Sequence, residues 1–230
     1  MKKIFQYQLY HLLLALVFII AVAWVFTQDS DISLGRYYGV NSAIWFWIGI
    51  VIPIFHQLYV TITWRLELYK QSLTRLFGER RAFVLYAIGF AILFSSRFLV
   101  VIVLSLSNAH TLAIEPMFAY VMAGLITPFV VYLFYSVKKY FTIERAFGID
   151  HFDKNYNVPY VKGGIFKYTD NAMYIVGLLI LFIPGLVLLS KAALIVALFN
   201  YLYIWVHFYC TEEPDMKEIY GNTPKDINGI

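Results

Sequence analysis

The chain has 230 residues, of which 61% are hydrophobic and only 14% are charged. Soluble domains carry charge on about a quarter of their residues, so this composition excludes an ordinary soluble globular protein. The formal net charge of +4 does not indicate a nucleic-acid partner, because no soluble basic domain is available to hold a nucleic acid.

Apolar runs of about 20 residues, the length needed to cross a hydrocarbon core of about 30 Å, recur along the chain. The first run follows Lys2 and Lys3 as a secretory signal would. It is too long for such a signal, so we expect it to be retained as a helix. The runs predict an all-α membrane protein with six transmembrane helices, at residues 9–26, 40–62, 82–106, 116–137, 171–189 and 191–209.

The basic residues divide unevenly between the predicted loops. With six helices, 15 of the 18 Lys and Arg residues fall on one side of the membrane. The opposite side has only Arg36 and Lys191, and Arg97 lies within a helix. Because cytoplasmic loops carry such an excess of positive charge, both termini are predicted to be cytoplasmic.

Residues 64–81 follow the second apolar run and are too polar to cross the membrane. One helical face carries the apolar side chains Leu66, Tyr69, Leu73, Leu76 and Phe77. This pattern predicts an amphipathic helix on the cytoplasmic membrane surface. The alternative is an extension of the second transmembrane helix into water.

The sequence thus divides into three parts. Residues 1–137 are expected to form a four-helix membrane region that includes the interfacial helix at 64–81. Residues 138–221 combine a polar cytoplasmic loop, a helical hairpin at 171–209 and a polar exit segment. Residues 222–230 are rich in turn-forming polar residues and are expected to be a flexible tail.

Two polar segments, residues 163–174 and 207–221, flank the hairpin. A turn near Ser190 and Lys191 folds the apolar stretch between them back on itself, so both segments are expected at the same membrane face. A pocket formed by two segments so far apart in sequence is the strongest functional indication in this chain.

The residue types in these segments suit a zwitterionic ligand. Glu212 and Glu213 are adjacent carboxylates that either bind a cation or hydrogen-bond donors, or lie solvated at a helix end. Gly163 and Gly164 allow close approach of the backbone to a ligand. A helix start near Asn171 offers unpaired N–H groups to a carboxylate. S-adenosylmethionine carries both a carboxylate and a positive sulfonium.

Residues 143–221 resemble the membrane-embedded methyltransferases, a group that includes phosphatidylethanolamine N-methyltransferases and isoprenylcysteine carboxyl methyltransferases. The shared pattern is a glycine-aromatic stretch, a short polar box ending in Met/Leu-Tyr, an apolar hairpin and a Glu-Glu exit motif. Here these parts are residues 164–168, 170–174 and 212–214, with the two polar parts separated by roughly 40 residues. The box and the exit motif are closest to the phospholipid branch.

The resemblance implies transfer of a methyl group from S-adenosylmethionine at the cytoplasmic face, with residues 138–221 as the methyltransferase core. The acceptor is expected to be a lipid from the bilayer, most of all a phospholipid amine, with an isoprenylcysteine carboxylate or a small thiol as alternatives. The implied cofactor contacts are Gly163, Gly164, Phe166, Tyr168, Asn171, Met173, Tyr174, His207, Glu212 and Glu213.

An amine acceptor must lose a proton before it attacks the methyl group. Asp170 and Glu213 are the expected catalytic residues, and His207 remains open for the same role. No metal is expected, because the run Asp150-His151-x-Asp153 is of a kind that occurs often by chance.

Two other classes of function remain as alternatives, a non-catalytic membrane scaffold and a six-helix transporter. The path of a transporter would be lined by His56, Arg97 and Glu115. Arg97 is expected either to pair with Glu115 or to contact a lipid phosphate, because an intramembrane arginine faces a partner or a cavity. His56 is expected to hydrogen-bond between helices. The oligomeric state is left open.

Overall fold

The computed structural model describes residues 3–156 and 161–221, and over these ranges the chain is almost entirely helical. Within these ranges, five helices are long and apolar enough to cross a membrane. They are α1 (Gln8–Gln28), α2 (Ser42–Lys70), α4 (Glu79–Ser107), α5 (Pro116–Ser136, continued by a π-helical turn at Val137–Phe141) and α9 (Lys191–His207). A two-stranded hairpin of β1 (Arg36–Tyr37) and β2 (Val40–Asn41) joins α1 to α2.

For five of the six expected segments, these bounds give helices that are long and apolar enough to cross a membrane. The remaining segment, expected at 171–189, is helical over Ala172–Val187 and shorter than the others. It consists of α7 (Ala172–Ile175), a 3-10 stretch (Gly177–Leu181) and α8 (Phe182–Val187). Gly177, Pro184 and Gly185 disfavour a continuous α-helix here. At about 1.5 Å per α-helical residue and about 2.0 Å per 3-10 residue, the 16 residues reach about 26 Å, which is less than the hydrocarbon thickness of about 30 Å.

The predicted turn of the C-terminal hairpin is confirmed. Helix α8 ends at Val187 and α9 begins at Lys191, with Leu189 in a left-handed backbone conformation between them. The Ser190 side chain caps α9 by accepting a hydrogen bond from the Ala193 N–H, and it also donates to Asn108 Oδ1 at 3.1 Å. Lys191 is held by Asp29 at 2.8 Å and by Asp31 at 2.6 Å. These contacts attach the turn to the ends of α1 and α4.

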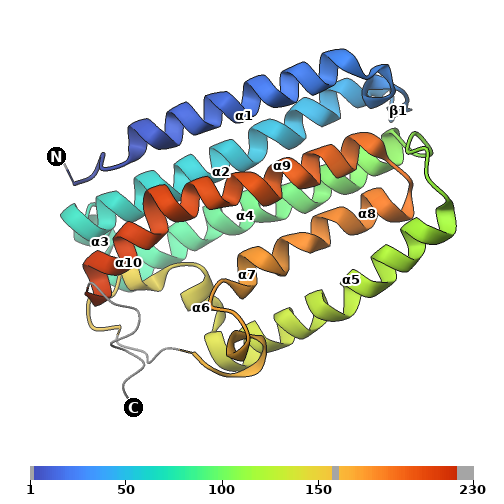
Figure 1. The fold of residues 1–230 in the computed structure, drawn as a ribbon. Coiled ribbons are helices and arrows are strands. Elements are labelled where there is room, and N and C mark those ends of the chain that lie inside the picture. Colours follow the sequence, from blue (N-terminus) through green and yellow to red (C-terminus); the bar gives the residue numbers. More distant parts are fainter. Residues whose placement is uncertain (1–2, 157–160, 222–230) are drawn as a thin grey trace.

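Helices α2, α4 and α9 form the centre of the bundle, and α1 lies along α2 and α9 (Figure 1). Helix α5 is set apart from this centre and contacts the short helix α8. A continuous apolar core that includes Phe46, Val101, Val196 and Tyr203 joins the central helices. Gly49 of α2 permits their close approach, because a Cβ atom at this position would lie 2.8 Å from a methyl group of Val196.

The expected interfacial helix at 64–81 is not a separate element. Residues 64–70 are the last turns of α2, which ends only at Gln71, where the backbone is left-handed. A short helix, α3 (Thr74–Phe77), follows, and α4 begins at Glu79. The helix continues because the polar residues at its end have partners: the Glu67 carboxylate accepts the N–H groups of Leu73 and Thr74. The alternative expectation, an extended second helix, is correct, although Arg65 and Glu67 in its last turns are buried and only Lys70 at its end is exposed.

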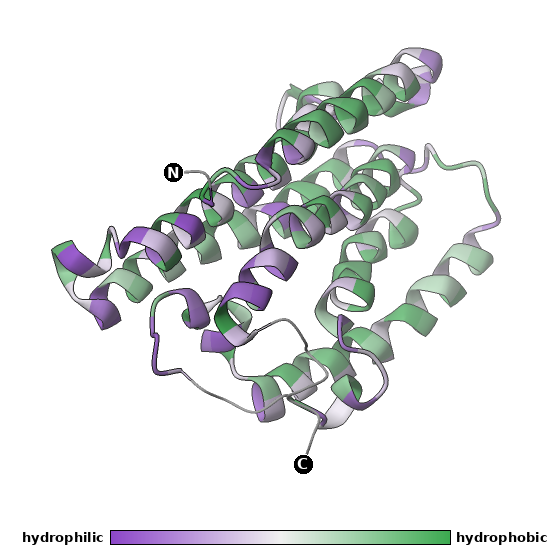
Figure 2. Cartoon of the chain, turned by 60° about the vertical axis from the view of Figure 1, so that its left-hand side comes forward, coloured by the Kyte–Doolittle hydropathy of each residue, from purple (hydrophilic) through white to green (hydrophobic). Residues whose placement is uncertain are grey.

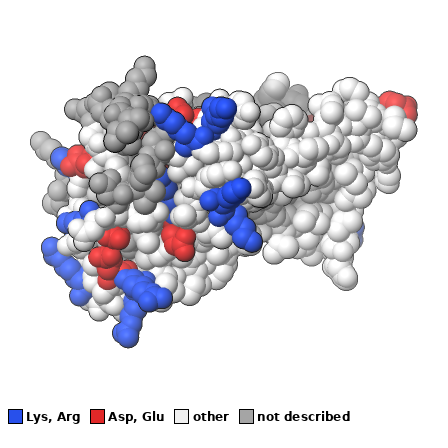
Figure 3. Space-filling view, turned by 90° about the horizontal axis from the view of Figure 1, so that it is seen from below, with Lys and Arg blue, Asp and Glu red and all other residues white. Residues whose placement is uncertain are grey.

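The surface agrees with an integral membrane protein. Most of the helix surface is hydrophobic, whereas polar residues gather at helix ends and in connecting segments (Figure 2). In the face shown in Figure 3, Lys and Arg cluster at one end of the molecule and a long stretch is free of charge. Lys3 and Glu218 form an ion pair of 2.7 Å, so the first and last described segments lie at the same end. The expected tail, residues 222–230, lies outside the described residues.

The close contact at Gly49 predicts a specific sensitivity of the bundle. Gly49→Leu should separate α2 from α9 and lower the free energy of unfolding by about 1–3 kcal/mol, measured as a fall in the melting temperature of the purified protein. Gly124→Leu is the matched control, since no atom lies within 4 Å of a Cβ at Gly124 on α5. Equal melting temperatures for the two variants would contradict this packing.

Candidate active site

The two polar segments that flank the hairpin meet in the structure, and we refer to residues 163–174 as the first signature and residues 207–221 as the second signature. Tyr174 of α7 donates a hydrogen bond from its hydroxyl to the carboxylate of Glu212, which ends the π-helical turn Phe208–Glu212 after α9. The Tyr174 ring also lies 6.0 Å from Trp205 and 5.9 Å from Phe208, both in edge-on geometry. The result is a partly buried carboxylate beside a group of aromatic rings at the end of the hairpin.

The two adjacent glutamates have different surroundings. Glu212 is partly buried and faces Tyr174. Glu213 begins α10 (Glu213–Tyr220) and forms an ion pair of 2.9 Å with Lys217 one turn later, with 37% of its side chain exposed. Pro214 occupies the first turn of α10, where its missing N–H is not needed. The exit motif therefore directs one carboxylate inward and one toward the surface.

The glycine-aromatic segment packs against the end of α5. A Cβ atom at Gly163 would lie 2.4 Å from the ring of Tyr140, and one at Gly164 would lie 2.4 Å from Ser136 Oγ. Gly164 also has a positive φ of 61°, which favours glycine. Phe166 is buried and stacks on Phe141 with 5.0 Å between ring centroids. The space that side chains at Gly163 and Gly164 would occupy is therefore filled by Tyr140 and Ser136.

The remaining residues of the first signature are spread around this contact. Tyr168 is 77% exposed, Asp170 is also exposed, and Met173 packs partly buried beside Leu133. Asn171 precedes α7 without capping it through its side chain. Helix α7 has only four residues, so the expected seat for a carboxylate at a helix start is not formed by a full helix.

His207 lies in a buried polar network that the sequence reasoning did not anticipate. Its Nδ1 is 3.3 Å from Thr61 Oγ1, which is 3.1 Å from Thr211 Oγ1. Gln8 of α1 donates a hydrogen bond to Thr211 Oγ1 at 3.3 Å and another to the Cys210 carbonyl at 3.1 Å. The sequence feature that could have indicated these contacts is the presence of single polar residues, Gln8, Thr61 and His207, within otherwise apolar helices.

A buried ion pair anchors the exit motif to α2. Arg65 Nε lies 2.6 Å from Asp215 Oδ1, and the two side chains are 1% and 0% exposed. The Arg65 guanidinium also donates to the carbonyls of Lys3 at 2.7 Å and Cys210 at 3.3 Å. His151 Nε2 faces the second carboxylate oxygen at 3.5 Å. From the sequence, Arg65 was expected in a surface helix at residues 64–81. Asp215, directly after the Glu-Glu-Pro motif, is the residue that could have indicated a partner for this arginine.

Residues 147–152 cover this ion pair. The His151 ring stacks on Trp64 at 4.1 Å, and Gly148 fits against the same indole, where a Cβ would approach within 2.4 Å. Asp150 accepts a hydrogen bond of 2.6 Å from the Tyr220 hydroxyl, and burial raises the pKa of its carboxyl above the ordinary value. Asp150 and His151 thus have separate partners, and both link the polar loop to α10.

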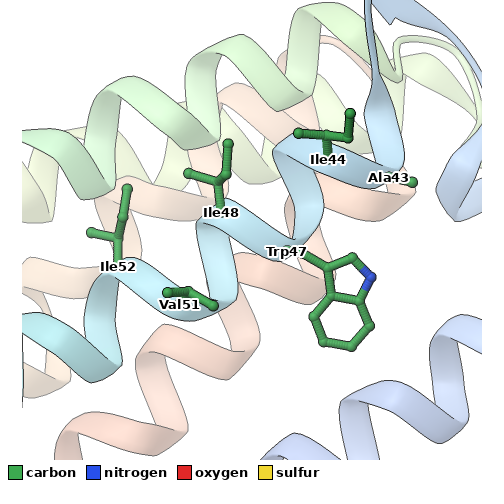
Figure 4. Close-up of a pocket in the computed structure, with 6 residues that line it drawn as sticks. All are labelled: Ala43, Ile44, Trp47, Ile48, Val51 and Ile52. Carbon is green, nitrogen blue, oxygen red and sulfur yellow. The ribbon is translucent and has the colours of Figure 1, made fainter.

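The structure also has an apolar groove on α2, away from this site. It is lined by Ala43, Ile44, Trp47, Ile48, Val51 and Ile52 (Figure 4). These residues offer no carboxylate or cation, so the groove has none of the chemistry that the two signatures bring together. The candidate active site is the polar end of the bundle, around the contact between Tyr174 and Glu212.

Fold and site together define an integral membrane protein with a polar centre at one end of a helical bundle. Comparison with known families identifies the kind of centre: residues 114–223, from the start of α5 through α10, match the phospholipid methyltransferase family. This finding confirms the resemblance to membrane-embedded methyltransferases and indicates an enzyme that transfers a methyl group. No match to the chain was found among curated proteins or solved structures.

The buried ion pair between Arg65 and Asp215 predicts that removing one of the two charges destabilises the protein far more than removing both. Asp215→Asn leaves an uncompensated charge inside the protein and should cost about 3–5 kcal/mol of stability. The double variant Arg65→Met, Asp215→Leu removes both charges and should recover much of that loss. Melting temperatures in detergent measure both effects.

The exposed ion pair of Lys3 with Glu218 supplies the control for this experiment. Glu218→Gln should leave the melting temperature unchanged, because exposed ion pairs contribute little to stability. A double variant of Arg65 and Asp215 as unstable as Asp215→Asn alone would contradict the account.

Proposed function

We propose that the protein is an S-adenosylmethionine-dependent methyltransferase whose acceptor is a lipid from the bilayer, most of all a phospholipid amine. The contact between Tyr174 and Glu212 carries the proposal, because it joins the two signatures of the matched family into one site. The methylation of an isoprenylcysteine carboxylate or a small thiol is the alternative outcome of the tests below.

The side chains around this contact suit the proposed cofactor. Glu212 offers a carboxylate to hydroxyl or amine donors, and the rings of Tyr174, Trp205 and Phe208 offer faces for a cation or an adenine. When bound, the cofactor supplies an electrophilic methyl group. The residues proposed to hold it are Gly163, Gly164, Phe166, Tyr168, Asn171, Met173, Tyr174, His207, Glu212 and Glu213.

The protein's main tasks would be alignment and proton removal. In-line displacement requires donor and acceptor atoms about 3–3.5 Å apart. We propose Asp170 and Glu213 as the groups that accept the proton of an amine, directly or through water. Both lie at the exposed edge of the site. His207 is enclosed beside Thr61 and is better placed to orient neighbouring groups.

The proposed reaction takes place at the cytoplasmic membrane face. Lys and Arg cluster at the end of the bundle that carries the site (Figure 3). Cytoplasmic segments next to a membrane carry this excess of positive charge. A lipid acceptor diffusing in the bilayer reaches this level without leaving the membrane, which explains why a methyltransferase is built from apolar helices.

The two glutamates should respond differently to substitution. Glu212→Gln should weaken binding of S-adenosylmethionine by about 10- to 100-fold, because hydrogen bonds to a charged group contribute about 1.5–3 kcal/mol. Tyr174→Phe should weaken it less. Glu213→Gln is the matched control, because it makes the same change at the neighbouring position. It should weaken binding less than Glu212→Gln, since the Glu213 carboxylate faces Lys217. Isothermal titration calorimetry measures all three, and equal losses for the two glutamate variants would contradict the assignment.

The acceptor is identified by a labelling experiment. Incubation of the purified protein with total lipid extract and S-adenosylmethionine labelled at the methyl group should transfer the label to a phospholipid headgroup, identified by mass spectrometry. Glu212→Gln should yield much less of this product at a cofactor concentration near the wild-type dissociation constant. Label found only on thiols or isoprenylated peptides would reject the phospholipid acceptor, and absence of any labelled product would reject the methyltransferase proposal.

A further inference from the structure

Arg97 of α4 lies inside the bundle and contacts residues of both α2 and α9. Only 3% of the residue is exposed. Its Nε donates a hydrogen bond of 2.8 Å to Asn200 Oδ1 of α9, and its Nη1 lies 3.4 Å from His56 Nδ1 of α2. The expected role of His56 between helices is thereby confirmed, and the neutral Asn200 is the main partner of the arginine.

The expected pair between Arg97 and Glu115 is not formed. Glu115 is exposed at the start of α5, while Arg97 faces α2 and α9. Among residues 3–156 and 161–221, no Asp or Glu lies within ion-pair distance of the guanidinium. The positive charge thus has no counter-charge within the part of the chain that the structure describes.

Four buried polar atoms of Arg97 and of the neighbouring α2 residues His56 and Gln57 also lack partners in the part of the chain that the structure describes. Arg97 Nη2, His56 Nε2 and both ends of the Gln57 amide are buried without a hydrogen bond in the described chain. Gln57 is 2% exposed. It lies on α2 one turn before Thr61, which contacts His207. Buried donors and acceptors are almost always satisfied in native proteins, so this concentration indicates a place where another molecule binds.

An uncompensated guanidinium inside a membrane protein is expensive to maintain. Desolvation of such a charge costs several kcal/mol, and arginines retained in the membrane interior face a partner or a polar cavity. A guanidinium presents its N–H groups in a planar fork that matches the oxygens of a carboxylate or a phosphate. The missing partner is therefore best supplied by a ligand with an oxyanion.

We infer that Arg97, with His56 beside it and Gln57 next to His56 on α2, forms an internal site for the oxyanion of a ligand of the proposed methyl transfer. This inference rests on the proposed function, which supplies two candidate oxyanions: the carboxylate of the cofactor and the phosphate of the lipid acceptor. The site belongs to α2 and α4, which lie outside the segment that matches the family.

The position of Arg97 relative to the active site fits this role. Its partner Asn200 precedes His207 by seven residues and Glu212 by 12 residues, and the longer interval corresponds to about 18 Å of helix. Thr61 and Gln57 occupy the interval on α2. A ligand held between Tyr174 and Glu212 at one end would thus direct an anionic group along this polar layer toward the guanidinium.

Arg97→Met tests the inference through two readouts on the purified full-length protein. The melting temperature without ligand should stay level or rise, because a buried charge is replaced by an apolar side chain of similar length. Affinity for one ligand should fall about 10- to 100-fold. Loss of the melting-temperature rise caused by S-adenosylmethionine assigns the site to the cofactor carboxylate. An increased KM for phosphatidylethanolamine in mixed micelles, with the cofactor effect intact, assigns it to the lipid phosphate.

The controls separate binding from folding. Arg97→Lys keeps the charge without the planar fork and should retain part of the affinity. Ser105→Ala changes a buried side chain on the same helix that already donates to the Val101 carbonyl, and it should alter neither affinity. Unchanged affinities in Arg97→Met, or an affinity loss that accompanies a large fall in the melting temperature, would overturn the inference.

Failure of the proposed function gives a different result. Wild-type protein that shows neither a shift with S-adenosylmethionine nor any labelled product would reject the methyltransferase activity. The effect of phosphatidylethanolamine on the melting temperatures of wild type and Arg97→Met would still decide whether Arg97 binds an oxyanion, since that comparison requires no catalysis.

Discussion

The buried ion pair between Arg65 and Asp215 determines how the polar end of the bundle is assembled. Within an apolar environment, charged and polar groups must be satisfied by the protein itself. Arg65 meets this requirement with Asp215 and with main-chain carbonyls of the N-terminal segment and of the π-helical turn. One side chain on α2 thereby fixes α10, the end of α9 and residue Lys3 to one another.

The position of Glu212 follows from this anchoring. The π-helical turn from Phe208 to Glu212 lies between α9 and α10, and Arg65 binds both the Cys210 carbonyl within this turn and Asp215 just after it. Glu212 is then directed toward Tyr174, while Glu213 points to Lys217 at the surface. Two identical residues that are neighbours in sequence thus receive different environments, which is the physical basis for proposing different roles.

The segment that matches the methyltransferase family does not contain the whole polar centre. Family similarity covers residues 114–223, whereas Thr61, Trp64 and Arg65 come from α2 and Gln8 and His11 come from α1. His11 Nε2 lies 3.0 Å from the Tyr203 hydroxyl and continues the network along α9. The N-terminal half therefore supports the matched segment through direct side-chain contacts, and it also contributes the arginine for which we infer an oxyanion partner.

The sequence by itself determined the class of protein, the five long apolar helices that the structure describes, the hairpin turn at Ser190 and the convergence of the two signatures. These features follow from local properties: the length of apolar runs, turn-forming residues and the order of motifs. Only the tertiary structure decided that residues 64–70 continue α2, that Arg97 contacts Asn200 instead of Glu115, and that Glu212 rather than Glu213 faces Tyr174. These outcomes depend on which buried polar groups face one another across helices, and the spacing of residues along one helix does not contain that information.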